Sequence, residues 1–159
     1  MVMRYCFSCG LYKQGLLHDL SKYGFTEFFA GVKYYQGTYS PHHNERKAKG
    51  YSAAWLHHKG RNKHHSEYWY DVIDGKYQPV KMPNRYVGEM ICDRIAASKN
   101  YNRGHFDRSI PLNYFLNEID RIIMHEDTKQ LTIKLLTMYR DDGQKATFKY
   151  IRKNLRNNA

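Results

Sequence analysis

Imidazole is concentrated in one short stretch of this sequence. Four of the nine histidines fall between residues 57 and 65, where the chain reads His57-His58-Lys59-Gly60-Arg61-Asn62-Lys63-His64-His65. Neutral imidazole is the commonest side-chain metal ligand, and clusters of this density are typical of metal sites. The alternative is that paired histidines at a turn are exposed polar residues or an anion-binding surface. We predict a metal role because other candidate ligands occur elsewhere in the chain.

A second candidate is the adjacent pair His18-Asp19, which offers one nitrogen and one oxygen ligand that can turn toward a single divalent ion. A further carboxylate could come from the segment 85–101, where Glu89 and Asp93 lie four residues apart and share a helix face. Such a mixed donor set suits Zn, Mn, Fe, Co or Ni and suits calcium poorly. We therefore predict a divalent transition metal as the cofactor.

The elements that must position these residues are mostly helices. Apolar residues at helical spacing predict the clearest helix over 85–101. Gly60 and Asn62 are helix-end and helix-start residue types, so a corner between two helices would bring the four histidines toward one point. Other helices are expected over 2–22, 26–36, from about 44, 51–58, 64–72, 111–123, 131–138 and near 148–155.

The helix over 26–36 is expected to turn its apolar residues inward, namely Phe28, Phe29, Val32 and Tyr35. Asp74-Gly75 predicts one small β-hairpin near residues 72–80. These patterns predict an all-α fold, a compact helical bundle with that single hairpin. At 159 residues, a single domain over 1–159 is the simplest organisation.

Charge and composition limit the partners. Lys and Arg outnumber Asp and Glu by 26 to 15, which gives a net charge of +11 and favours anionic partners such as phosphorylated small molecules, nucleic acid or an acidic protein. No run approaches the roughly 20 apolar residues of a membrane span, so no membrane partner is expected. The beginning of the sequence lacks secretory features, and three cysteines suit a reducing compartment, so a cytoplasmic location is predicted.

The only CxxC pair is Cys6 and Cys9. Two cysteines at this spacing could bind zinc or carry redox chemistry, or they could line one face of a helix. The sequence leaves these alternatives open.

Three segments resemble those of a known protein family. His18-Asp19-Leu20-Ser21-Lys22 is similar to the HD-x-G/S-K segment of the HD superfamily of metal-dependent phosphohydrolases. The order of later motifs, histidines on following helices and then an aspartate, also resembles that superfamily. More narrowly, the chain resembles an uncharacterised bacterial family of HD-like helical proteins, some labelled catalase, in the segments HDLSKYGFTEF, AWLHHKGRNKHHSEYW and MPNRYVGEMICDRIAASK.

The resemblance implies an HD-domain-like helical fold and a set of metal ligands. His18 and Asp19 match the paired ligands, and Asp93 matches the distant carboxylate. The histidine-rich corner matches as well. There His58 and His65 are expected to face inward, with His57 and His64 as alternative ligands.

The resemblance also suggests residues for catalysis and substrate binding. Asp19 and Glu89 are the candidate catalytic carboxylates, and Glu89 could instead orient a ligand or face solvent beside an arginine. The candidate residues for binding a substrate phosphate are Lys22, Arg61 and Lys63, each of which could equally be a surface charge.

One departure from the superfamily concerns the region before the HD pair. The superfamily motif has another histidine on an earlier helix, whereas no histidine precedes His18 here. Either the chain begins late relative to its relatives, or a corner histidine takes the missing place.

The leading function is a metal-dependent phosphohydrolase that acts on a phosphorylated small molecule or nucleotide through metal-activated water. The first alternative is a module that binds nucleic acid or an acidic partner without catalysis. The second is metal-dependent redox chemistry at the same site, as the catalase label suggests. The sequence does not identify the oligomeric state.

Overall fold

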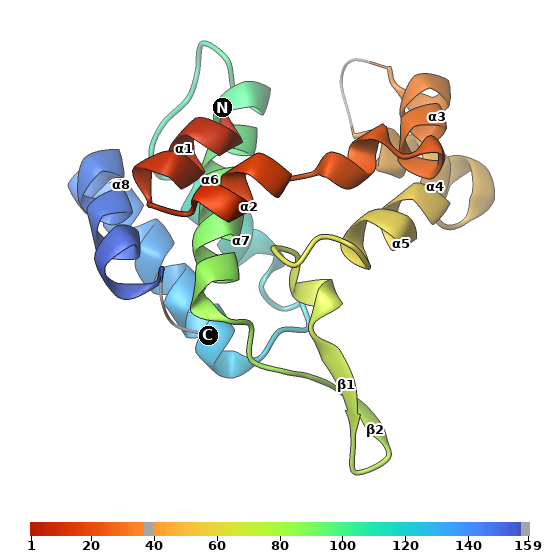
Figure 1. Ribbon diagram of the computed structural model, residues 1–159. Coiled ribbons are helices and arrows are strands. Elements are labelled where there is room, and N and C mark those ends of the chain that lie inside the picture. The colour runs from red at the N-terminus through yellow and green to blue at the C-terminus, as the bar shows by residue number, and fades with distance from the viewer. Residues whose placement is uncertain (37–39, 157–159) are drawn as a thin grey trace. The chain divides into compact units, whose positions relative to one another are not determined.

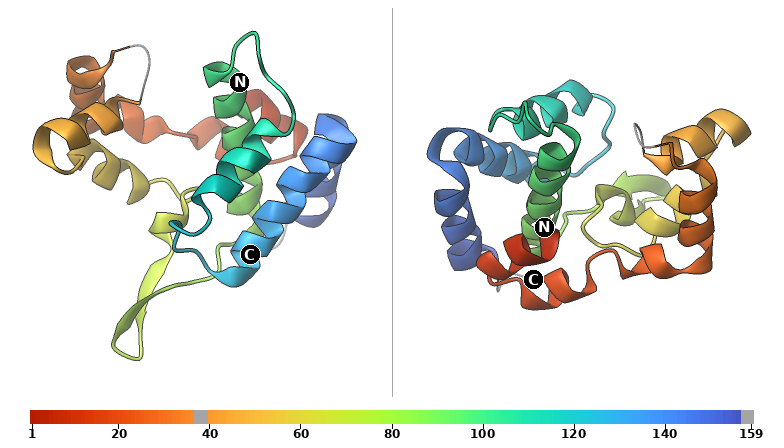
Figure 2. Two further views of the ribbon diagram at one scale, coloured as in Figure 1. Left: turned by 180° about the vertical axis from the view of Figure 1, so that it is seen from behind. Right: turned by 90° about the horizontal axis from the view of Figure 1, so that it is seen from above.

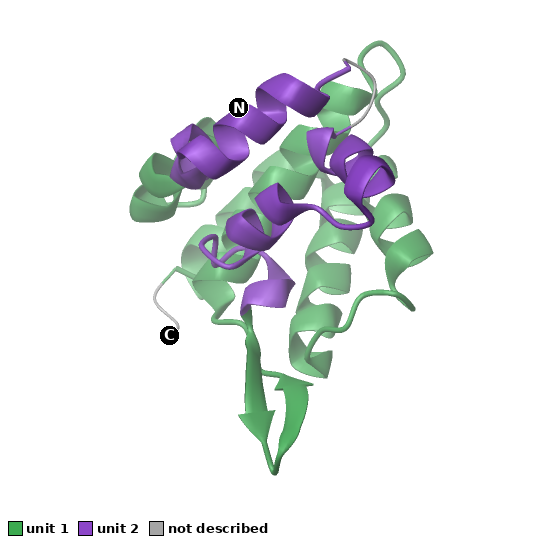
Figure 3. Ribbon diagram, turned by 90° about the vertical axis from the view of Figure 1, so that its right-hand side faces the viewer, with its two compact units in different colours: residues 1–18, 69–159 green, residues 19–68 purple. Residues whose placement is uncertain are grey.

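The computed structural model describes residues 1–36 and 40–156 (Figure 1). Two compact units divide the chain (Figure 3): unit 1 comprises Met1–His18 and Trp69–Ala159, and unit 2 comprises Asp19–Tyr68. Unit 2 is thus a continuous stretch between the two parts of unit 1. The single domain over 1–159 stays a prediction.

Unit 1 consists of helices and one hairpin. Its elements are α1 (Val2–Ser8), α2 (Tyr12–Leu17), β1 (Tyr70–Ile73), β2 (Lys76–Pro79), α6 (Asn84–Tyr101), α7 (Ile110–Glu118) and α8 (Glu126–Asn154). The helix α6 contacts α1, α2, α7 and α8, and Figure 2 shows α7 and α8 beside it. All of the main apolar core lies in this unit.

Close packing around α6 depends on Gly88. A Cβ atom at this position would lie 2.9 Å from Cγ2 of Ile151 and 3.0 Å from Cδ1 of Leu11, both closer than side chains normally approach. The missing side chain lets α8 pack tightly on α6. Glu89 directly follows Gly88 and Asp93 lies one turn further along α6, so this packing also fixes where those carboxylates lie.

The three cysteines are buried in the unit 1 core. Sγ of Cys9 lies 3.6 Å from Sγ of Cys92, and none of the three side chains is exposed. Hydrogen bonding with Cys6 and Cys9, together with burial, raises the pKa of the Cys92 thiol well above its ordinary value. A buried, protonated thiol behaves as a small apolar side chain. These contacts support the packing alternative for the CxxC pair.

Several predicted elements are confirmed, and others are wrong in detail. The structure is mostly helical with one small antiparallel two-stranded sheet, and Asp74-Gly75 forms its turn. The helix predicted over 85–101 is confirmed as α6. The expected helix over 64–72 is wrong, because residues 66–68 form only a 3-10 turn and 70–73 form strand β1.

The ends of the chain also differ from the predicted helices. The single helix expected over 2–22 is divided into α1, α2 and a 3-10 turn. The two helices expected after residue 125 form one long α8 with a kink at Gly143. None of the helices within residues 1–36 and 40–156 combines the length and apolar character needed to cross a lipid bilayer.

Unit 2 is built from short helices. They are η1 (Leu20–Tyr23), α3 (Phe25–Tyr34), α4 (Pro41–Lys49), α5 (Ala53–Lys59) and η2 (Ser66–Tyr68). The helix α3 contacts η1, α4 and α5, and α4 also contacts α5. Pro41 stands at the first turn of α4, which therefore begins before the start expected near residue 44.

The interior of unit 2 is polar. Among its described residues, the only buried hydrophobic side chain is Ala54, and the other buried residues are Glu27, Glu45, Ser52, His58, Asn62, His64 and Ser66. A unit of this size that lacks an apolar core normally needs another source of stability, such as a metal ion. Hydrogen bonds and ion pairs must therefore hold these short helices in place.

The apolar residues of α3 lie on the opposite side from this interior. Phe28, Phe29, Val32 and Tyr35 are all exposed, so the expectation that they face inward is wrong. The buried residue of α3 is Glu27. The helix is oriented by a buried carboxylate rather than by its apolar stripe.

Glu45 shows how the polar interior is stabilised. Its carboxylate accepts hydrogen bonds from the Ser52 hydroxyl (2.7 Å), the Lys49 ammonium (3.0 Å) and the Ala54 N–H (3.3 Å). Burial alone would raise the pKa of Glu45, but these hydrogen bonds outweigh it and lower the pKa below its ordinary 4.5. The ionised carboxylate thus stabilises the start of α5.

We expect Glu45→Gln to lower the free energy of unfolding at pH 7 by about 1.5–3 kcal/mol, the range for hydrogen bonds to charged groups. Because the native pKa is lowered, this contribution is present above about pH 4.5 and is lost as the pH falls through the native pKa. Urea unfolding followed by circular dichroism at pH 7 and at about pH 3.5 measures the difference, with exposed Glu67→Gln as control. An unchanged Glu45→Gln effect at both pH values would contradict this account.

Candidate metal centre

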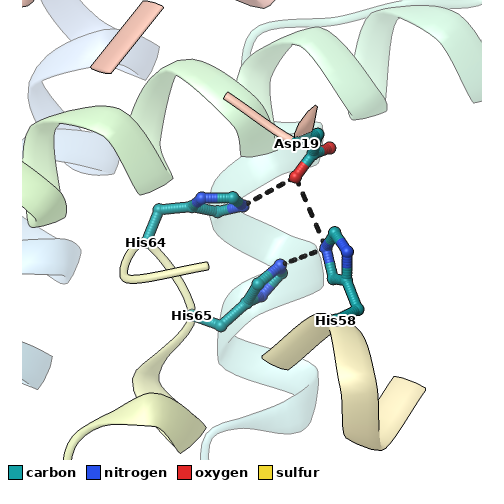
Figure 4. A group of neighbouring side chains, drawn as sticks. All are labelled: Asp19, His58, His64 and His65. Carbon is teal, nitrogen blue, oxygen red and sulfur yellow. Dashed lines mark hydrogen bonds and ion pairs between the residues drawn. The ribbon is translucent and has the colours of Figure 1, made fainter. Parts of the chain in front are cut away.

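Four side chains of unit 2 direct ligand atoms toward one another (Figure 4). Oδ1 of Asp19 lies 3.4 Å from Nε2 of His58 and 3.5 Å from Nε2 of His64. Nε2 of His58 lies 2.9 Å from Nε2 of His65. One ligand atom from each of the four residues lies within 4.8 Å of every other. We call these four residues the His3Asp cluster.

These distances fit the ligand shell of a small divalent ion. An ion with bonds of about 2.0–2.1 Å to nitrogen and oxygen holds tetrahedral ligands roughly 3.3 Å apart. Three of the six separations in the His3Asp cluster are 2.9–3.5 Å and bracket that value, and the others are at most 4.8 Å. His58 and His64 are buried, whereas Asp19 and His65 are partly exposed. The cluster therefore has the donor types and spacing to bind a metal, and part of it is in contact with solvent.

Local structure places each ligand. Asp19 precedes η1 in the left-handed backbone region (φ 58°), which aspartate tolerates better than most residues. His58 lies in the last turn of α5, and His64 and His65 follow in the turn before η2. The Asn62 amide fixes that turn by donating to the Ser21 hydroxyl (2.7 Å) and the His58 carbonyl (2.9 Å).

Glu27 connects the cluster to α3. Its two carboxylate oxygens each lie 2.7 Å from an Nδ1 atom, one of His57 and one of His58. When Nδ1–H of His58 donates to this carboxylate, the lone pair of Nε2 is left to face the other ligands. Metal-binding histidines usually have such a carboxylate partner, which fixes the tautomer and the ring orientation.

The charges of this pair favour metal binding. Burial would raise the pKa of Glu27, but hydrogen bonds from Ser21, His57 and His58 lower it overall and keep the carboxylate ionised. Burial lowers the pKa of His58 despite the nearby carboxylates of Asp19 and Glu27, so its imidazole is neutral, which is the form that binds metals. Sequence reasoning missed Glu27. The available signal was a lone acid among the aromatic residues of segment 25–35.

A second group of predicted residues lies in unit 1. Nδ1 of His18 lies 3.0 Å from Oε1 of Glu89, and its Nε2 lies 3.5 Å from Oδ1 of Asp93. Here too one carboxylate contacts Nδ1 while Nε2 faces another carboxylate. The helix α6 presents Glu89 and Asp93 one turn apart, as the sequence predicted. The HD pair is divided, with His18 in unit 1 and Asp19, the next residue, in unit 2.

The other predicted residues lie near the His3Asp cluster or in the turn that carries it. His57 is bonded to Glu27, and Lys22 lies 2.5 Å from Oδ2 of Asp19. Arg61 is exposed and donates to the His57 carbonyl, and exposed Lys63 lies over the ring of Tyr68. The catalytic, ligand and phosphate-binding roles of all these residues stay predictions.

Comparison with known proteins identifies a family. Residues 1–138 match a family described as "Family of unknown function (DUF5662)". The chain belongs to this family. No curated protein and no solved structure matches the chain. The family match supports the resemblance to an uncharacterised family, while the HD-like relation and bacterial origin have no support from it.

We expect Glu27→Gln to weaken metal binding about 10–100-fold, the usual effect of removing a carboxylate that orients a ligand histidine. Glutamine keeps the shape of the side chain but lacks the charge that fixes the His58 tautomer. Titration with Co(II), followed by its visible absorption, measures the dissociation constant. Glu67→Gln is the matched control, because Glu67 is an exposed carboxylate of the same unit. Equal affinities of wild type and Glu27→Gln would show that Glu27 does not support the metal.

Proposed function

We propose that this protein is a metal-dependent phosphohydrolase with an HD-like centre, acting on a phosphorylated small molecule or nucleotide. The observation that carries the proposal is the convergence of three imidazole Nε2 atoms and one carboxylate oxygen in the His3Asp cluster. The net charge of +11 adds support, because a basic protein attracts anionic substrates. A cytoplasmic location is part of this proposal.

The donor set limits the choice of metal. Three nitrogens and one carboxylate oxygen suit Zn, Mn, Fe, Co or Ni, and the lack of thiolate ligands disfavours soft ions such as Cu(I). Asp19, His58, His64 and His65 would hold the ion. When bound, a divalent ion can polarise a phosphoryl oxygen and lower the pKa of bound water to near neutrality.

The side chains around the cluster have distinct tasks in this mechanism. Glu27 keeps the Nε2 lone pair of His58 directed at the other ligands. Oδ1 of Asp19 faces the cluster, and its Oδ2 contacts the Lys22 ammonium. Oδ2 is therefore placed to accept a proton or to hold the Lys22 ammonium near a phosphate. Arg61 and Lys63 would offset the charge of the transferring phosphoryl group. Glu89 contacts His18 in unit 1, and its predicted catalytic role is part of this proposal.

The experiment combines metal analysis with paired activity assays. Protein loaded separately with Zn, Mn, Fe, Co or Ni is assayed for hydrolysis of p-nitrophenyl phosphate and bis(p-nitrophenyl) phosphate, and for consumption of hydrogen peroxide. We expect phosphoester hydrolysis, with His58→Ala and His64→Ala losing bound metal and at least about 100-fold in kcat/KM. His105→Ala is the control, because that imidazole is exposed and lies outside the cluster.

The outcomes separate the candidate functions. Hydrolysis that is unaffected by His58→Ala would contradict the proposed site, and a protein that binds no metal would contradict the proposed function. Peroxide consumption by the Mn- or Fe-loaded protein without phosphoester hydrolysis would instead favour redox chemistry at the same ligands.

A further inference from the structure

The helix α3 and the residues next to its two ends carry six exposed apolar side chains. These side chains lie along one side of the helix and at its two ends. Their exposed fractions are 83% for Tyr23, 83% for Phe25, 52% for Phe28, 60% for Phe29, 68% for Val32 and 68% for Tyr35. We call these six residues the aromatic face. The Phe25 and Phe29 rings stack with their centroids 6.0 Å apart, and Phe28 meets Phe29 edge-on at 5.8 Å.

The orientation of α3 prevents unit 2 from covering this face by turning the helix. Glu27 lies on the opposite side of α3, where it is 6% exposed and bonded to His57 and His58. Rotating the aromatic face inward would withdraw this carboxylate from both imidazoles and move it toward solvent. The same contact that orients the candidate metal ligands therefore keeps the aromatic face exposed.

The exposed area of the aromatic face is similar to the area that one partner buries in a protein–protein interface. Aromatic side chains contribute about 150–250 Å² each when buried, so five of them at the observed exposures present roughly 500–900 Å² before Val32 is counted. The largest apolar patch of a typical monomer is about 300–600 Å², and a standard interface buries about 800 Å² on each partner. The aromatic face alone can thus supply one side of a stable dimer.

The charges near the face favour an apolar protein partner. The only acid of α3, Glu27, is buried, and Lys33 lies over the Tyr34 ring, with its Nζ 5.4 Å from the centroid. A nucleic acid would need a row of basic side chains along the face. A second copy of the chain presents an uncharged surface of matching size.

We infer that the aromatic face binds the same face of a second copy of this chain. In this arrangement the two-fold axis is perpendicular to the two α3 helices, which then pack antiparallel, with Phe28 and Phe29 near the axis and Phe25 of one copy facing Val32 or Tyr35 of the other. Such a contact holds in place the helix that carries Glu27. The inference does not rest on the proposed function, because it uses only the surface of α3.

The test measures molecular mass in solution. Analytical ultracentrifugation of the full chain over about 1–100 μM is expected to show a dimer with twice the mass of one chain. Phe29→Lys places two like charges near the axis and is expected to give a monomer, raising the dimer dissociation constant at least 100-fold. Tyr77→Lys is the control, because Tyr77 is 79% exposed on β2 and lies outside the aromatic face. It should stay dimeric.

Two further measurements distinguish the other outcomes. Circular dichroism and the urea unfolding midpoint of Phe29→Lys should match those of the wild type, which shows that the variant is folded. A wild-type monomer at 100 μM, or a Phe29→Lys protein that stays dimeric, would overturn the inference. Co-sedimentation of a monomeric wild type with phosphatidylglycerol vesicles, abolished in Phe29→Lys, would overturn it in favour of a lipid surface.

Discussion

The carboxylate of Glu27, held between the imidazoles of His57 and His58, is the contact on which unit 2 depends. It lies in an interior where, among the described residues, Ala54 is the only buried hydrophobic side chain. Hydrophobic burial normally supplies most of the stability of a fold, and here it contributes little within the unit. Short helices around a polar interior stay in place only if each buried polar group keeps its partner.

This constraint explains several features together. It turns α3 so that its acid faces the histidines, fixes the tautomer that frees Nε2 of His58, and leaves the phenylalanines of α3 exposed. An ion bound by the His3Asp cluster would link η1, α5 and the turn before η2. In other small units an apolar core holds the helices together in this way. Unit 1 needs no such link, since α6 buries a continuous apolar core.

The sequence predicts correctly those elements for which the local residue pattern and the packing in the folded protein favour the same structure. The regular spacing of apolar residues identified α6, and Asp74-Gly75 identified the hairpin. The prediction also placed His58 and Asp19 in one site, and the structure brings their ligand atoms within 3.4 Å. These features depend on local periodicity, turn chemistry and a recognisable pair of residues.

The errors arose where a polar contact decides the conformation. A helix was expected over 64–72, yet the histidine-rich segment folds as a turn that Asn62 stabilises. The hydrophobicity of Phe28 and Phe29 predicts that they face inward. The sequence pattern does not show that a buried carboxylate on the same helix outweighs this preference. Glu27 itself went unnoticed, since a single acid in a helix usually faces solvent.

The central claim is that three imidazoles and one carboxylate of unit 2 bind a common metal ion. X-ray absorption spectroscopy at the metal K-edge tests it most directly, because imidazole rings give a characteristic multiple-scattering pattern. The account predicts a shell of about three imidazole nitrogens and one carboxylate oxygen at roughly 2.0–2.1 Å for the Zn-loaded protein, and no such shell for His64→Ala, which should lose the bound ion. A shell of water and carboxylate oxygens without imidazole scattering would contradict it.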